Sequence, residues 1–90
     1  MDDPLPADVL SAIAEERLRQ LEKWGRQDHE PAQWLAILVA ELGELAQALI
    51  EVDLRGHEQW RPYWHSGLVQ LAAVAIAAAE SDDRLTGGTG

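Results

Sequence analysis

The chain has 90 residues, no cysteine, and 16 acidic against 7 basic residues, which gives a formal net charge of −9. This length predicts one small domain, 1–90, whose limited core needs further support. Without thiols, that support must come from self-association or an oxygen-ligated metal rather than from disulfides or thiolate sites. The acidic balance argues against nucleic-acid binding, which requires clustered Lys and Arg. Anionic nucleotides can still bind where divalent cations bridge them to carboxylates.

The sequence predicts neither a signal peptide nor a membrane span. Residues 1–9, MDDPLPADV, are acidic and interrupted by prolines, whereas a signal peptide has a basic start and an apolar run. The most apolar stretch, 68–79, has about 12 residues and contains Gln70, whereas about 20 are needed to cross a bilayer. We therefore expect a soluble, cytoplasmic protein without a membrane partner.

A first helix is predicted from about residue 6 or 8 to residue 24. Its apolar face consists of Leu10, Ile13, Ala14, Leu18, Leu21 and Trp24. Pro6 suits a first helical turn, and Gly25 suits a C-terminal cap after the basic Lys23. A polar loop over 25–33 follows, in which Pro31 is placed to be the first residue of the next helix.

The second predicted helix, 34–52, is the longest periodic segment of the chain. An apolar seam recurs along it in steps of three and four residues: Leu35, Leu38, Leu42, Leu45, Leu49 and Val52. Two acids, Glu41 and Glu44, share the stripe beside this seam with Trp34, Ile37 and Ala48. The helix is expected to end near Asp53, before a break at Gly56.

The third helix is predicted over 66–81, with two alternatives for its start. Pro62 either begins this helix or kinks one that starts near His57. Its apolar side chains lie on several faces, more than one small chain can cover. We therefore predict an all-α fold, a three-helix protomer that a second copy completes as an isologous helical bundle. The ordered core is expected over 6–82, with a flexible tail at 83–90.

Glu41 and Glu44 are the candidate metal ligands. Carboxylates at positions i and i+3 share one helix face, and Mg²⁺ prefers oxygen ligands, so the pair can hold one ion; a solvated helix face is the alternative. Glu51 lies about 10 Å further along the helix axis, too far to join them. Gln70, the lone polar residue of its apolar run, either faces these acids or reaches a backbone carbonyl or solvent.

The loop after the first helix is rich in groups that can bind a nucleotide. Lys23 can neutralise a phosphate and Trp24 can stack on a base, while Gln27 and His29 can donate hydrogen bonds. In the alternative interpretation, Trp24 caps the core and Lys23 pairs with a neighbouring Glu. The spacing of the three histidines does not match a zinc site.

Three segments, 16–29, 34–51 and 68–80, together resemble the MazG-like proteins of the all-α nucleoside triphosphate pyrophosphohydrolase superfamily. The segments read ERLRQLEKWGRQDH, WLAILVAELGELAQALIE and LVQLAAVAIAAAE, in that order. The resemblance implies an all-helical, oligomeric protein that uses Mg²⁺ to hydrolyse an NTP or dNTP to the monophosphate and pyrophosphate. It also implies a ligand pattern of E-E-x-x-E on one helix and E-x-x-D on the next.

The sequence departs from this pattern at three positions. Ala40 stands where the first acid is expected, and Gly67 and Gln70 stand where the second helix should supply E-x-x-D. The remaining acids, Glu41 and Glu44, would hold one Mg²⁺ weakly, with Mn²⁺ as a substitute, unless a neighbouring subunit donates more. We therefore expect a MazG-like pyrophosphohydrolase with a degenerate metal site and weak or absent activity.

Two other functions remain open. The chain can be a non-catalytic oligomeric protein, nucleotide-binding or structural, that retains the MazG fold. It can also bind a different protein through its alanine-rich faces, which predicts a mixed oligomer. The pattern leaves open the nucleotide base, the choice between dimer and tetramer, and the roles of Trp60 and Trp64.

Overall fold

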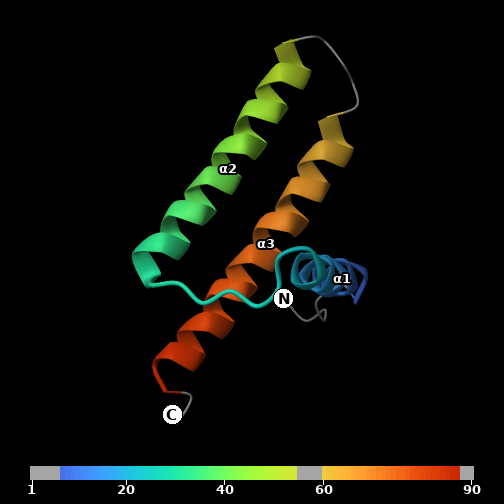
Figure 1. The fold of residues 1–90 in the computed structure, drawn as a ribbon. Helices are drawn as coiled ribbons and strands as arrows, with labels where there is room; N and C mark the ends of the chain where they lie inside the picture. The colour runs from blue at the N-terminus through green and yellow to red at the C-terminus, as the bar shows by residue number, and fades with distance from the viewer. Residues whose placement is uncertain (1–6, 55–59, 88–90) are drawn as a thin grey trace, which may run out of the picture.

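The computed structural model describes residues 7–54 and 60–87, and three helices account for most of them: α1 (Ala7–Trp24), α2 (Pro31–Leu54) and α3 (Trp60–Leu85) (Figure 1). No strand occurs in the described ranges, so the all-α prediction with three helices is confirmed. Self-association stays a prediction. The predicted break at Gly56, the start near His57, the side chain of Val52 and the end of the tail lie outside the described residues.

Local chemistry ends α1 and begins α2 where the sequence predicts. Gly25 has a φ of 73°, and its backbone N–H donates to the Leu21 carbonyl at 2.8 Å, which closes the C-terminus of α1. Pro31 is the first residue of α2. Glu30 precedes it as the N-cap, and the Gln33 side-chain oxygen accepts the Glu30 backbone N–H at 3.2 Å, as in a capping box.

The third helix is longer than predicted at both ends. It begins at Trp60, so Pro62 lies in its first turn, where a missing backbone N–H costs nothing. The alternative, a helix that starts near His57 and is kinked at Pro62, concerns residues outside the described ranges and stays a prediction. The helix also continues to Leu85, three residues into the segment predicted as a tail.

Helix α3 is the central element of the fold. Helix α2 lies antiparallel along one side of it, and α1 crosses it on the other side, seen nearly end-on in Figure 1. The backbones of α1 and α2 do not approach each other. The core is small and sits mainly between α2 and α3, where Trp34 packs with Val74 and Ala77.

The leucine seam predicted along α2 is only partly buried. Leu45 is buried and Leu38 and Leu49 are half-buried, whereas Leu35 and Leu42 are 62% and 52% exposed. The prediction that this seam forms the packing face is therefore wrong for Leu35 and Leu42 in the single chain.

The face of α2 that meets α3 is instead the neighbouring stripe that begins with Trp34. This tryptophan is only 6% exposed, and Ile37, one turn further on, packs against the same cluster. An indole buries more apolar area than a leucine, so turning the helix to bury Trp34 outweighs leaving Leu35 in solvent. As a result, Glu41 on the same stripe is drawn toward α3.

The window Pro31–Glu51 of α2 is long and apolar enough to cross a membrane, by length and composition alone. It is a different and longer segment than 68–79, the stretch that the sequence identifies as the most apolar. The central helix of a soluble bundle meets the same criterion, so the property does not decide between the two environments.

Gly67 marks the closest approach of α2 and α3. A Cβ atom added there would lie 2.3 Å from Leu45 Cδ1 and 3.1 Å from Leu45 Cγ. Real Cβ atoms do not approach another atom this closely, so Leu45 occupies the space that a side chain at residue 67 would need. The position at which an acid was expected is therefore filled by the helix contact.

We expect Gly67→Ala to lower the free energy of unfolding by about 1 kcal/mol. Overpacking costs about 1–3 kcal/mol, which exceeds the gain in helix propensity of about 1 kcal/mol. In a Leu45→Ala background the collision is removed, so the same substitution should become stabilising. Denaturant unfolding of the four variants measures both effects; a stabilising Gly67→Ala in the parent chain would contradict the contact.

Candidate functional site

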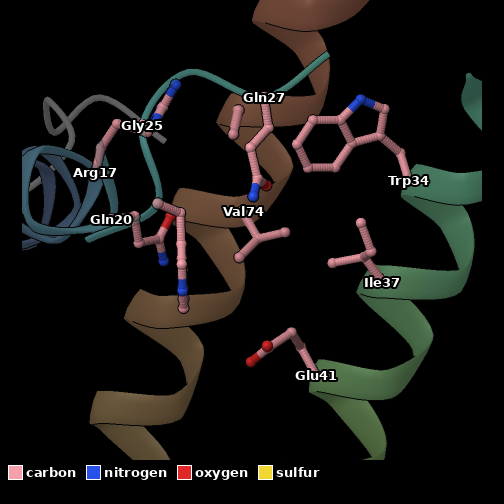
Figure 2. Close-up of a pocket in the computed structure, with 10 residues that line it drawn as sticks. Arg17, Gln20, Gly25, Gln27, Trp34, Ile37, Glu41 and Val74 are labelled. Atoms are coloured by element: carbon pink, nitrogen blue, oxygen red, sulfur yellow. The ribbon is translucent and has the colours of Figure 1, made fainter. Parts of the chain in front are cut away.

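Three adjoining cavities lie near the point where α1 crosses α3. The first, the three-helix cavity, has a volume of about 240 Å³. Figure 2 shows Trp34, Ile37 and Glu41 in succession along α2, with Val74 of α3 and Gln20 of α1 facing them. Its lining also includes Arg17, Trp24, Gly25, Gln27 and Ala77.

The second cavity, the acid cavity, lies between α2 and the N-terminal half of α3. It has a volume of about 390 Å³ and is lined by both candidate acids, Glu41 and Glu44, together with Gln70 and Tyr63. The Gln70 side-chain nitrogen donates to Ser66 Oγ at 3.2 Å, which leaves its amide oxygen to accept a hydrogen bond or to coordinate a cation. Gln70 therefore lines the same cavity as the two acids, while its side-chain hydrogen bond goes to Ser66 rather than to a backbone carbonyl.

The third cavity joins the nucleotide-binding candidates of α1 to Gln70. It has a volume of about 300 Å³ and is lined by Lys23, Trp24, Gln20 and Glu16 as well as Gln70. Because Glu41 lines the first and second cavities and Gln70 lines the second and third, these two residues connect the whole site.

Most of the residues predicted for the site meet there, but His29 does not. Lys23, Trp24 and Gln27 line the cavities around Glu41 and Gln70. The His29 ring instead packs edge-on against Trp34, with centroids 4.9 Å apart, and borders a separate apolar groove. His29 therefore contributes to packing rather than to this site.

Trp24 and Lys23 remain available to a ligand. Trp24 is 51% exposed, so it does not cap the core. Lys23 Nζ lies 4.9 Å above the Trp24 ring and forms no ion pair with any described residue. This arrangement places a cation over one face of a half-exposed indole ring.

The surroundings of Glu41 disfavour the ionised form of its carboxyl group. Its partial burial raises the pKa of its carboxyl above the ordinary value of 4.5, and the nearby charges of Glu44 and Glu16 raise it further. The charges of Glu44, on the same helix, and of Glu16, on α1, therefore both act against the ionised form of Glu41. A bound cation would relieve their repulsion.

Several polar residues that line the site were not predicted from the sequence, among them Glu16, Gln20 and Tyr63. Gln20 is only 7% exposed, and its side-chain nitrogen donates to Glu16 at 3.1 Å and to the Gln70 carbonyl at 3.4 Å. A signal for Gln20 was present, because it follows Ile13 by seven residues and so lies on the apolar face of α1. Glu16 and Tyr63 gave no comparable signal.

The donor set fits at most one weakly held divalent cation. The described residues contain no group of three or more His, Cys, Asp or Glu that could hold a metal ion. The side chains with oxygen atoms that line the acid cavity are the carboxylates of Glu41 and Glu44, the amide of Gln70 and the hydroxyls of Tyr63 and Ser66. Residue 67 adds no donor, because it is a glycine whose Cβ position is crowded by Leu45.

A clamp between the 25–30 loop and the end of α3 holds the far wall of the site. Arg84 donates to Asp28 Oδ1 at 2.9 Å and to the Gln27 carbonyl at 3.3 Å. The His29 backbone N–H donates to Ser81 Oγ at 3.2 Å, and Ser81 is fully buried. The hydrogen bond from Arg84 is the main reason that the pKa of Asp28 lies below its ordinary range.

In comparisons with protein families, with characterised proteins and with solved structures, no match to this chain is found.

We expect Arg84→Ala to speed hydrogen exchange at the His29 amide, because the loop loses its main tie to α3. Arg26→Ala is the matched control: it also removes a guanidinium beside Asp28, at 3.3 Å, but one that has no contact with α3. Amide exchange followed by NMR tests the difference. Equal protection in both variants would show that Arg84 does not hold the loop.

The clamp should also weaken in acid. A lowered pKa of Asp28 means that the pair contributes stability above the ordinary carboxyl pKa of 3.8, and that this contribution is lost as the pH falls through the lowered value. In Arg84→Ala the Asp28 pKa should return upward. An NMR titration of the Asp28 carboxyl in both proteins measures the shift.

We expect Glu41→Gln to stabilise the fold at neutral pH by less than about 1 kcal/mol, the usual scale for a partly exposed charge. With a raised pKa, the favourable contribution of protonated Glu41 is fully present below about pH 4.5 and is lost as the pH rises through the raised value. The gain should therefore vanish in acid. The free energy of unfolding, measured across pH, tests this, with Glu51→Gln at an exposed position as the control. If both variants gain the same stability, the cause is the lower net charge of the protein rather than the surroundings of Glu41.

Proposed function

We propose that this chain is a MazG-like protein that binds a nucleoside triphosphate, as an NTP or dNTP, with one Mg²⁺ held by Glu41 and Glu44. Its pyrophosphohydrolase activity, which would release pyrophosphate and a nucleoside monophosphate, is weak or absent. The observation that carries the proposal is the position of Glu41, which lines the cavity with Trp24 and Gln27 as well as the cavity with Glu44 and Gln70. A ligand can therefore contact the stacking face and the acids together.

Different residues around Glu41 and Gln70 would bind different parts of the nucleotide. Trp24 offers an exposed ring for a base, and the ammonium of Lys23 beside it can pair with a phosphate. Arg17 also lines the three-helix cavity, but its guanidinium pairs with Glu80 at 2.6 Å and is less available. Glu41 and Glu44 repel a bare triphosphate, so binding should require a divalent cation, Mg²⁺ or Mn²⁺.

Turnover needs more than these residues supply. A bound Mg²⁺ would polarise a phosphate and lower the pKa of a bound water. The protein must then position that water and accept its proton, but both candidate carboxylates are already needed as ligands. Gln70 offers a neutral amide, and residue 67 has no side chain and no room for one. Binding is therefore favoured over hydrolysis.

The second candidate is a non-catalytic oligomeric protein with a nucleotide-binding or purely structural role. The close contact between Gly67 and Leu45 favours it, because packing has taken the place of a ligand at this position. In either case we propose a cytoplasmic homo-oligomer, a dimer or a tetramer. The acidic composition and the exposed apolar side chains support this part of the proposal.

Calorimetric titration with a panel of NTPs and dNTPs, with and without Mg²⁺, tests the binding. We expect Mg²⁺-dependent binding that Glu44→Ala abolishes and that the matched Glu51→Ala, two turns further along α2, preserves. The same panel is assayed for pyrophosphate release. Turnover that Glu44→Ala abolishes would contradict the degenerate site, and the lack of binding in every condition would favour the structural role.

A further inference from the structure

The side of the α2–α3 pair opposite the acid cavity is apolar and uncovered, and we call it the apolar flank. It consists of the α2 residues Leu35, Val39, Leu42, Ala46 and Ile50 and the α3 residues Trp64, Leu68, Ala75 and Ala79, all classed as exposed. Leu35 and Ala79 line one groove of about 410 Å³, to which α1 contributes no residue. Both rows therefore lie on the same side of the pair, and neither carries a charge.

The hydrophobic core of the single chain is small, and the apolar flank is not part of it. The described hydrophobic core has five members, and only three of them, Trp34, Leu45 and Val74, are larger than alanine. Thirteen large hydrophobic side chains of the described residues are exposed, and six of them, Leu35, Val39, Leu42, Ile50, Trp64 and Leu68, belong to the apolar flank.

The exposed row of α3 is symmetric about its own midpoint. Trp64 and Ala79 lie at equal distances from the point between residues 71 and 72, and so do Leu68 and Ala75. An antiparallel copy of α3 centred on this point would bring each large side chain opposite an alanine. Self-complementary large-to-small pairing of this kind fills an interface without voids.

Charges at the two ends of the row follow the same symmetry. Arg61 and Asp82 are exposed and have the same midpoint as the apolar pairs. Neither forms an ion pair within the described part of the chain. In the antiparallel arrangement, Arg61 of one copy meets Asp82 of the other at both rims of the interface.

The exposed row of α2 has a midpoint at the same level. Leu35 and Ile50, like Val39 and Ala46, are symmetric about the point between residues 42 and 43. In the hairpin this level of α2 lies beside the middle of α3, because Leu45 contacts Gly67 and Leu38 shares a groove with Ala78. A single two-fold axis at this level can therefore relate both α2 and α3 to their copies in a second chain.

We propose that two copies of this chain associate through the apolar flank around this axis, with α3 antiparallel to the α3 of the second copy and α2 antiparallel to its α2. The four helices form a common core, and Trp64 packs against Ala79 across it. Helix α1 and the acid cavity remain on the outside, so each copy keeps its own site. The proposed function names only a homo-oligomer, whereas this axis also specifies which residues of the two copies lie opposite each other.

Cysteine crosslinking tests this register directly, because the parent chain has no cysteine. Ala72→Cys lies next to the axis, so two copies should form a disulfide-linked dimer on mild oxidation. Ala79→Cys lies on the same flank but about 20 Å from its own copy along the antiparallel pair. It should stay uncrosslinked alone, yet crosslink to a Trp64→Cys copy when the two variants are mixed.

Charge reversal at the rims provides an independent measure. Sedimentation of the parent should give a dimer, and Arg61→Asp or Asp82→Arg should each weaken it severalfold. The double variant Arg61→Asp/Asp82→Arg should recover the parent affinity, because it restores opposite charges across the interface. The control Leu18→Glu, on the exposed side of α1, should leave the dimer unchanged.

Several outcomes would overturn the proposal. A parallel pair would crosslink Ala79→Cys as readily as Ala72→Cys. A monomer at all concentrations, or a monomer that binds phospholipid vesicles through α2, would show that the flank has another use. This test is independent of nucleotide binding: a dimer with no affinity for any NTP supports the interface while the proposed function fails, and the reverse result is equally distinct.

Discussion

The packing of α1 and α2 onto the same helix, α3, is the interaction that holds the fold together. Helices α1 and α2 do not contact each other through their backbones, so their relative position depends on α3 and on the 25–30 loop that joins them. The three-helix cavity exists because these two helices meet the same stretch of α3 from different directions. The ties between this loop and Ser81 and Arg84 keep that geometry in place.

The parts of the fold set by local chemistry were predictable from the sequence. A glycine that ends α1 and a proline that begins α2 act through the backbone of adjacent residues, so their neighbours in the chain suffice to identify them. The orientation of α2 was not predictable, because its periodicity alone cannot weigh one indole against a row of leucines. That choice depends on Val74 and Ala77, which lie about 40 residues away.

The same distinction applies to the site. Glu41 and Glu44 stand one turn apart on a single helix, so the sequence reveals the pair. Glu16 and Tyr63 reach the cavities only because α1 crosses α3 and because α3 begins earlier than expected. Residues that approach a site from another helix leave no periodic signal on their own, and packing alone brings them there.

The contact between Gly67 and Leu45 limits how the protein could change over evolutionary time. An acid at residue 67 would first collide with a buried leucine, and a smaller residue at 45 would first open a cavity in a core of only five hydrophobic side chains. Either first step loses stability before the second restores it. Two coupled substitutions are therefore needed before residue 67 can carry any side chain without loss of stability.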